Sequence, residues 1–177
     1  MAPSCPTQRA AVPRFNPVIF VTVGGPLPFD RLVHTVDRWA KEQQRREVFA
    51  QIGDSTTPPN YIEWQRFLSP SEFQAKARQA EFIIAHAGMG SILTAIEVGK
   101  ALVIMPRRAH LGEHRNDHQW ATVRRLADGV GVTVAADEGE LLERLARLEE
   151  LSSTTERRSH DYKRLLEFLR STIEASE

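Results

Sequence analysis

One short segment, residues 86–91, gathers residue types that can bind an anion. It reads His86-Ala-Gly88-Met-Gly90-Ser91, and it lies between an apolar run at 81–85 and a segment of helical period at 91–98. The glycines let a backbone approach a ligand closely, and the unpaired N–H groups at a helix start attract anions. Ser91 can cap the helix or donate to a phosphate oxygen. This chemistry suits a diphosphate, although the segment is neither a Gly-Lys-Ser/Thr phosphate loop nor a Gly-x-Gly-x-x-Gly dinucleotide motif.

A plainer interpretation of the same segment stays open. Gly88 and Gly90 can simply form a tight turn between a strand and a helix, with His86 as a hydrogen-bonded, partly buried side chain. A histidine, two glycines and a serine at one helix start, however, converge on the place where a ligand would bind. We therefore favour the phosphate site.

A second polar cluster lies at 107–119, where His110, His114 and His118 are spaced by four residues. This spacing can place metal ligands on one helix face. Gly112, however, precedes the expected helix and takes His110 off that face, so we expect no metal site. The other interpretation is a solvated helix start, and the arginines at 107 and 108 are either surface residues or neutralise phosphate charge.

These motifs must be positioned by an alternation of strand-like and helix-like segments. Continuous apolar runs alternate with segments of helical period, which indicates an α/β fold: a Rossmann-like parallel sheet with helices on both faces. In such a sheet, ligands bind at the carboxyl ends of the strands. Strands are expected at 17–23, 47–52, 61–67, 81–85, 101–105 and 130–134, and helices at 30–46, from 69, 91–98, 113–128, 138–148 and after 155.

Length and charge narrow the class of protein further. The 177 residues carry 23 Lys and Arg against 23 Asp and Glu, and this zero net charge argues against a nucleic-acid binder that works through bulk electrostatics. No uncharged stretch reaches the roughly 20 residues that span a bilayer, and the lone Cys5 fits a reducing cytoplasm. We expect a flexible tail at 1–16, one domain at 17–151, and a C-terminal helix at 152–177.

The segment from His86 to Leu93 resembles the nucleotide-sugar motif in the C-terminal half of GT-B glycosyltransferases. The segment from Phe20 to Val33 is similar to the first strand and loop of glycosyltransferase family 28 in its split form, in which the donor-binding half is a separate small protein. That branch includes the catalytic subunit of the dolichol-linked N-acetylglucosaminyltransferase and bacterial exopolysaccharide transferase subunits. The resemblance covers about residues 18–134, and it implies the fold of the C-terminal half of a GT-B enzyme.

The resemblance also implies roles for individual residues of this sequence. Gly88, Gly90 and Ser91 would contact the diphosphate of a UDP-sugar, with His86 supporting or contacting the same group. Gln119, which follows His118, would bind the donor sugar, and residues 64–67 would line the uracil pocket. The remaining donor-site residues are Thr22, Gly24 and Gly25, which border the cleft, and Thr94, which stands where many relatives carry an acidic residue that grips the ribose.

The resemblance further implies an inverting, metal-independent transferase with no cofactor besides its UDP-sugar substrate. No general base is identified in this sequence, so the base is expected on a membrane-anchored, acceptor-binding partner that carries the lipid-linked acceptor. The chain would then be cytoplasmic and peripheral to the membrane through that partner, in polysaccharide or glycolipid biosynthesis. Its C-terminal helix, with an apolar stripe at Tyr162, Leu165, Leu169 and Ile173, would pack on the partner or on its own domain. Two alternatives stay open: a non-catalytic nucleotide-binding regulatory module, which Thr94 would suit, and a structural protein without a ligand.

Overall fold

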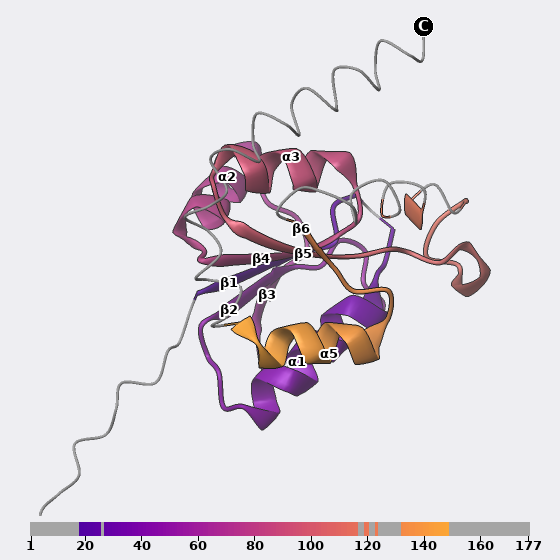
Figure 1. Ribbon diagram of the computed structural model, residues 1–177, viewed down its shortest axis with the longest axis horizontal. Helices are drawn as coiled ribbons and strands as arrows, with labels where there is room; N and C mark the ends of the chain where they lie inside the picture. Colours follow the sequence, from indigo (N-terminus) through magenta and orange to yellow (C-terminus); the bar gives the residue numbers. More distant parts are fainter. Residues whose placement is uncertain (1–17, 26, 117–118, 121–122, 124–131, 149–177) are drawn as a thin grey trace, which may run out of the picture.

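The fold is a parallel sheet between two layers of helices, seen in a computed structural model that describes residues 18–25, 27–116, 119–120, 123 and 132–148 (Figure 1). The six strands run in the order β3-β2-β1-β4-β5-β6, and every pairing between neighbours is parallel. The strands are β1 (Ile19–Thr22), β2 (Val48–Gln51), β3 (Glu63–Gln65), β4 (Phe82–His86), β5 (Ala101–Met105) and β6 (Val132–Val134).

The apolar runs of the sequence become the central strands. All four residues of β1 and all five of β5 are buried, as expected for strands that are covered on both faces. Strand β1 pairs with β4 in the register that places Ile19 beside Phe82 and Thr22 beside Ala85. The carboxyl ends of β1 and β4 therefore lie side by side.

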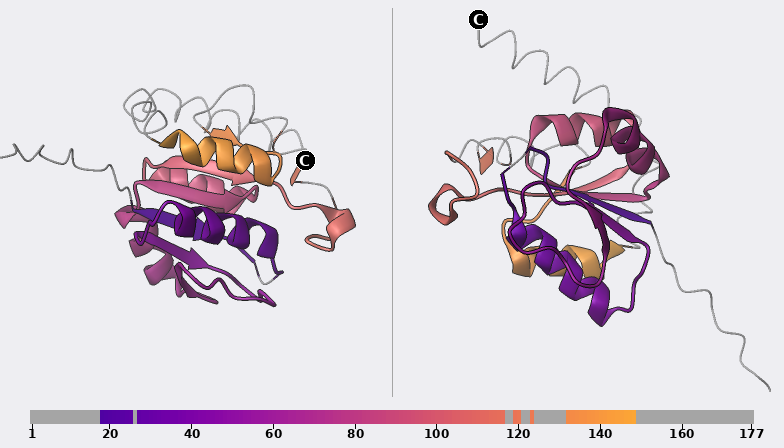
Figure 2. Two further views of the ribbon diagram at one scale, coloured as in Figure 1. Left: turned by 90° about the horizontal axis from the view of Figure 1, so that it is seen from below. Right: turned by 180° about the vertical axis from the view of Figure 1, so that it is seen from behind.

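In the described part of the chain, the α-helices lie in two pairs, one on each face of the sheet (Figures 1 and 2). The helices α1 (Asp30–Glu42) and α5 (Glu138–Ala146) lie on one face, and α2 (Pro70–Gln79) and α3 (Met89–Glu97) lie on the other. Each layer buries its own apolar core, one built around Leu32, Val36 and Leu141 and the other around Phe20 and Ile92. Burial of these side chains is the main force that fixes the helices against the sheet.

The N-termini of the helices differ in how they are capped. Helix α2 has a complete capping box between Ser69 and Glu72, and Asp137 caps α5 by accepting a hydrogen bond from the backbone N–H of Glu140 at 2.9 Å. Helix α3 begins after Gly88 and has no side-chain cap. The first N–H groups of α3 therefore have no partner from a capping side chain.

The expected α/β fold is confirmed. Strands β1, β2 and β3 are shorter than expected, β4 is shifted by one residue, and helix boundaries need correction. The first helix ends at Glu42 rather than 46. The helix expected from 91 begins at Met89, so Ser91 lies inside its first turn and does not cap it. The helix expected from 113 is wrong at its start: a 3-10 turn, η1 (Ala109–Leu111), ends at Gly112 with a φ of 71°, and residues 113–116 are bends.

Parts of the predicted organisation lie outside the described residues, namely the tail at 1–16, the C-terminal helix at 152–177 and most of 117–131. Within the described part of the chain, none of the helices has the length and apolar character needed to span a membrane.

Candidate functional site

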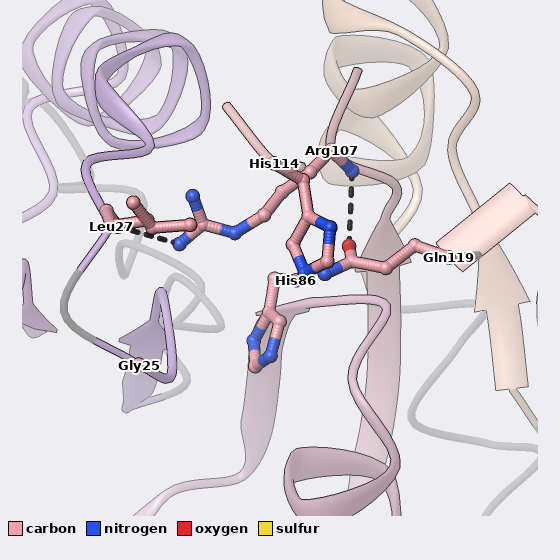
Figure 3. A pocket seen from close by; sticks show the side chains of 6 residues that line it. All are labelled: Gly25, Leu27, His86, Arg107, His114 and Gln119. Carbon is pink, nitrogen blue, oxygen red and sulfur yellow. Dashed lines mark hydrogen bonds between the residues drawn. The ribbon is translucent and has the colours of Figure 1, made fainter. Parts of the chain in front are cut away.

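The candidate site lies where the strand order reverses, between β1 and β4. From β1 the chain leads to α1 on one face of the sheet, and from β4 it leads to α3 on the other (Figure 1). Ligands of open parallel sheets bind in the crevice that this divergence leaves at the strands' carboxyl ends. A cavity of about 180 Å³ is found there, and its lining residues are Gly25, Leu27, His86, Arg107, His114 and Gln119 (Figure 3).

His86, the last residue of β4, fills the space between the two loops. A Cβ atom on Gly24 would lie 2.1 Å from His86 Cε1, and one on Gly88 would lie 2.0 Å from His86 Nε2. Both distances are far below van der Waals contact, so only glycine at both positions leaves room for the imidazole. Gly24 also has a φ of 75°, which favours glycine. The first role of Gly24 and Gly88 in this structure is thus to accommodate His86.

The imidazole of His86 is held by hydrogen bonds from both sides. Its Nδ1 lies 3.4 Å from Ser91 Oγ, and the ring also bonds to the backbone of Thr22. Burial is the main reason that the pKa of His86 is lowered to about 4, and the positive charges of Arg107 and His114 act in the same direction against the Thr22 bond. At neutral pH the ring is therefore uncharged, and it supports the loops without attracting an anion by charge.

The other two glycines of the predicted site face open space. A Cβ atom on Gly25 or on Gly90 would meet nothing within 4 Å. Gly90 is exposed and lies in the first turn of α3, where the backbone N–H groups lack a side-chain cap. An anion can therefore approach this helix start and gain from both its N–H groups and the helix dipole.

Thr22 shapes the loop after β1 from inside the protein. It is completely buried, and its hydroxyl donates to Gln51 Oε1 at 2.7 Å and accepts from the N–H of Gly24 at 3.2 Å. The Gln51 amide in turn donates to the carbonyl of Arg66 at 3.0 Å. The side chain of Thr22 is thus engaged in fixing Gly24.

Gln119 forms the opposite wall of the cavity. Its Oε1 accepts a hydrogen bond from the backbone N–H of Arg107 at 3.0 Å, and the residue is only 8% exposed. No described residue accepts a hydrogen bond from the NH₂ group of this amide, so the group remains available to donate at the cavity. His114 lies beside it, with Nδ1 3.1 Å from the carbonyl oxygen of Asn116 (Figure 3). His118 lies outside the described residues.

An ionic network fixes the segment that carries His114. The carboxylate of Glu113 is 2.7 Å from Nε and 2.9 Å from Nη2 of Arg31, and it also accepts the backbone N–H of Arg108 at 2.7 Å. The side chains of both Arg31 and Glu113 are about nine-tenths buried. This pairing draws Glu113 toward α1, which explains why no helix begins at 113.

Several predicted residues do not line the cavity. Thr94 is half-buried on α3, and Glu97 on the same helix is exposed. Trp64 and Phe67, on and just after the edge strand β3, are 39% and 54% exposed. Within the described part of the chain, no group of three or more His, Cys, Asp and Glu residues could hold a metal ion.

The sequence did not predict that Arg107 has a central structural role in this site. Its guanidinium is buried in the cavity wall and donates to four backbone carbonyls. Burial lowers the pKa of Arg107 to about 10, against the opposing effect of the Glu113 carboxylate, so the side chain remains charged at neutral pH. The available signal was its position directly after Pro106, at the carboxyl end of a fully apolar strand.

The strand order 3-2-1-4-5-6 and a cavity at the reversal point define a Rossmann-like α/β domain. Residues 18–172 match the family model of the glycosyltransferase family 28 C-terminal domain. The chain belongs to this family of glycosyltransferase domains, as the resemblance of its motifs implied. A search among curated proteins finds no match.

Solved glycosyltransferases share this fold at low sequence identity. MurG from Acinetobacter baumannii is 19% identical with a TM-score of 0.55, and the alignment covers 89% of this chain and 50% of MurG. VinC, solved in complex with dTDP, is 17% identical with a TM-score of 0.54, over 88% of this chain and 41% of VinC. ALG13 is 18% identical with a TM-score of 0.52, over 74% of this chain and 84% of ALG13. The chain thus spans half or less of MurG and VinC but most of ALG13.

Proposed function

We propose that this chain is the donor-binding subunit of a two-component, inverting glycosyltransferase that transfers a sugar from a UDP-sugar to a lipid-linked acceptor. The observation that carries the proposal is the cavity at the strand reversal, which is lined by the Gln119 amide and Arg107, together with the uncapped start of α3, which follows the neighbouring strand end at β4. An anionic group and a hydroxyl-rich group can thus be bound side by side.

The diphosphate of the donor would lie at the start of α3. Gly90 and Gly25 leave room for it, and the N–H groups of the first turn would donate to its oxygens. The buried guanidinium of Arg107 lines the cavity, as Gly25 does, and adds a positive charge. Together these groups would stabilise the charge that develops on the departing UDP, which is the main electrostatic task in sugar transfer.

The donor sugar would lie against Gln119. Because the backbone of Arg107 already occupies Oε1, the amide is oriented with its NH₂ group free to donate. A sugar hydroxyl is a suitable acceptor for this NH₂ group.

The general base for the acceptor hydroxyl is proposed to come from the partner. His86 does not suit this task, because a base with a pKa of about 4 is weak at neutral pH and because the ring is held between Gly24 and Gly88. His114 is the other histidine that lines the cavity. Loss of the acidic limb of the pH profile, where activity rises as a general base loses its proton, in His114→Ala would therefore move the base into this chain.

A membrane-anchored partner is proposed from the resemblance to the split form of family 28 and from the lengths of the similar structures. The chain covers 84% of ALG13 but only 50% of MurG, which supports the proposal that it would act as the donor-binding half of a divided enzyme. The partner would supply the acceptor-binding half and hold this chain at the cytoplasmic face of the membrane.

Two measurements test the proposal. Isothermal titration of the purified chain should show binding of UDP and of UDP-sugars, and the absence of heat with every nucleotide would refute the donor site. Transfer of labelled sugar to a lipid acceptor should then require both the chain and membranes that contain the partner. Nucleotide binding without transfer under these conditions would favour the regulatory module, for which Thr94 in place of an acidic ribose ligand is the supporting feature.

A further inference from the structure

Arg107 is a buried cation whose hydrogen bonds all go to uncharged groups. The residue is only 2% exposed. Nη1 donates to the carbonyls of Pro28 at 2.6 Å and Glu113 at 2.9 Å, and Nη2 donates to those of Val23 and Leu27, both at 2.8 Å. Within the described part of the chain, no carboxylate forms a hydrogen bond or a salt bridge with it.

Three of these four carbonyls belong to the loop that connects β1 to α1. The loop therefore curls around the guanidinium, and the ring of Phe29 lies on one side with its centroid 4.8 Å from Cζ. Figure 3 shows the side chain extending from the end of β5 toward Leu27. The side chain of Arg107 thus joins this loop to the end of β5, where Arg31 of α1 makes a second link by donating to the carbonyl of Pro106 at 3.0 Å.

The backbone of the same residue fixes the opposite wall. The N–H of Arg107 donates to Gln119 Oε1 at 3.0 Å, a buried hydrogen bond. Arg107 thus contacts the loop after β1 through its side chain and Gln119 through its main chain. It therefore contributes to the placing of Leu27 on one side of the cavity and of Gln119 on the other.

We propose that Arg107 is a positioning residue of the nucleotide-sugar site, whose guanidinium fastens the loop after β1 to the end of β5 and so sets the width of the cavity. The nature of the ligand rests on the proposed function above, whereas the fastening of the loop does not. Lysine cannot replace arginine here, because one ammonium group with three donors cannot reach four carbonyls that surround a planar guanidinium.

The competing explanation is that Arg107 contributes only its positive charge. Substitution by lysine distinguishes this explanation from fastening of the loop. Arg107→Lys keeps the positive charge and loses the planar fork, whereas Arg107→Gln loses both. Arg46→Gln is the matched control for charge, because Arg46 is exposed, stacks on Tyr61 and precedes β2 at the opposite end of the sheet from the cavity.

The first measurement is amide hydrogen exchange of the free chain, followed in peptides that cover residues 20–29. Because the loop loses hydrogen bonds in both variants, exchange in Arg107→Lys and Arg107→Gln should be faster by about tenfold or more. Helix α2 and the Arg46→Gln control should exchange as in the wild type. Wild-type protection of residues 20–29 in Arg107→Lys would overturn the proposal.

The second measurement detects the effect of the charge at position 107 independently of the loop, by NMR titration of the His86 ring. The charge of Arg107 lowers the pKa of His86, so this pKa should rise in Arg107→Gln and stay low in Arg107→Lys. UDP affinity should fall by about tenfold in both variants, equivalent to about 1.4 kcal/mol. Full UDP affinity in Arg107→Lys would show that charge alone matters and would also overturn the proposal.

Two further outcomes keep the test decisive. If Arg107→Gln does not fold, the guanidinium signals of the ¹⁵N-labelled wild type decide: an anchored group gives separate, slowly exchanging Nη–H signals, and one averaged signal would contradict the fastening. If the wild type binds no UDP, the proposed function fails, while the exchange result still decides whether Arg107 holds the loop.

Discussion

The buried imidazole of His86 predicts a specific loss of stability in mild acid. Burial and the nearby charges of Arg107 and His114 lower the pKa of His86 to about 4, from 6.5 in an unfolded chain. Between these values the unfolded chain binds a proton that the folded chain does not, so the free energy of unfolding falls as the pH falls from 6.5 toward 4. Below about pH 4 this contribution changes no further.

The size of the effect follows from the shift itself. At about 1.4 kcal/mol per pKa unit, His86 should remove about 3 kcal/mol of stability between pH 7 and pH 4. The variant His86→Gln lacks this titration. The substitution also lowers the free energy of unfolding, because glutamine fills the space between Gly24 and Gly88 less well. This loss is the same at every pH. The carboxylates titrate alike in both proteins, so they do not affect the comparison.

The assay is urea unfolding at several pH values between 4 and 7, followed by tryptophan fluorescence. As the pH falls from 7 to 4, the free energy of unfolding of the wild type should fall by about 3 kcal/mol more than that of His86→Gln. In the folded wild type, the NMR titration of the His86 ring should have its midpoint near pH 4. A midpoint near 6.5, or parallel pH dependences in the two proteins, would refute the account of His86 as a buried, neutral spacer.

Three further predictions concern the cavity and its turn. Gly88→Ala should destabilise the fold by about 1–3 kcal/mol because its Cβ meets the His86 ring, and urea unfolding should show a much smaller cost in a His86→Ala background; equal costs would contradict the contact. Gly90→Val should keep the fold, since its side chain meets only open space, but should abolish UDP binding in isothermal titration, and unchanged affinity would count against the α3 site. Gln119→Ala should weaken binding of UDP-sugar more than binding of UDP, and equal losses would remove Gln119 from the sugar site.

The order of strands and helices in this fold can be predicted because the central strands are uninterrupted apolar runs in the sequence. Segments such as Ala101–Met105 are apolar throughout and end at a proline or glycine, so the alternation of strands and helices can be read directly. The glycines and the serine of residues 86–91 also predict the turn at this place. Once a parallel sheet is inferred, such a turn must lie at a carboxyl end, where ligands bind.

The different roles of the four glycines could not be predicted from the sequence. Gly24 and Gly88 make room for His86, whereas Gly25 and Gly90 face open space. This distinction arises only because β1 and β4 pair side by side, which brings Gly24 to a histidine far along the chain. Residue type alone gives all four the same interpretation.

Arg107 and Glu113 were hidden for a related reason. The partners of Arg107 are backbone carbonyls, which no residue pattern reveals. Glu113 looks like part of a charged helix start, but its buried pairing with Arg31 takes the backbone out of helical geometry. In both cases a long-range contact outweighs the local tendency of the chain.

The most direct test of the donor site is a titration of the ¹⁵N-labelled chain with UDP, followed by NMR at each backbone amide and at the Gln119 side chain. The account predicts that the largest shifts occur at Gly25, Gly90 and Ser91, with the Gln119 side-chain NH₂ shifting only when a UDP-sugar replaces UDP. Shifts confined to another part of the sheet, or no shifts at saturating UDP, would contradict it.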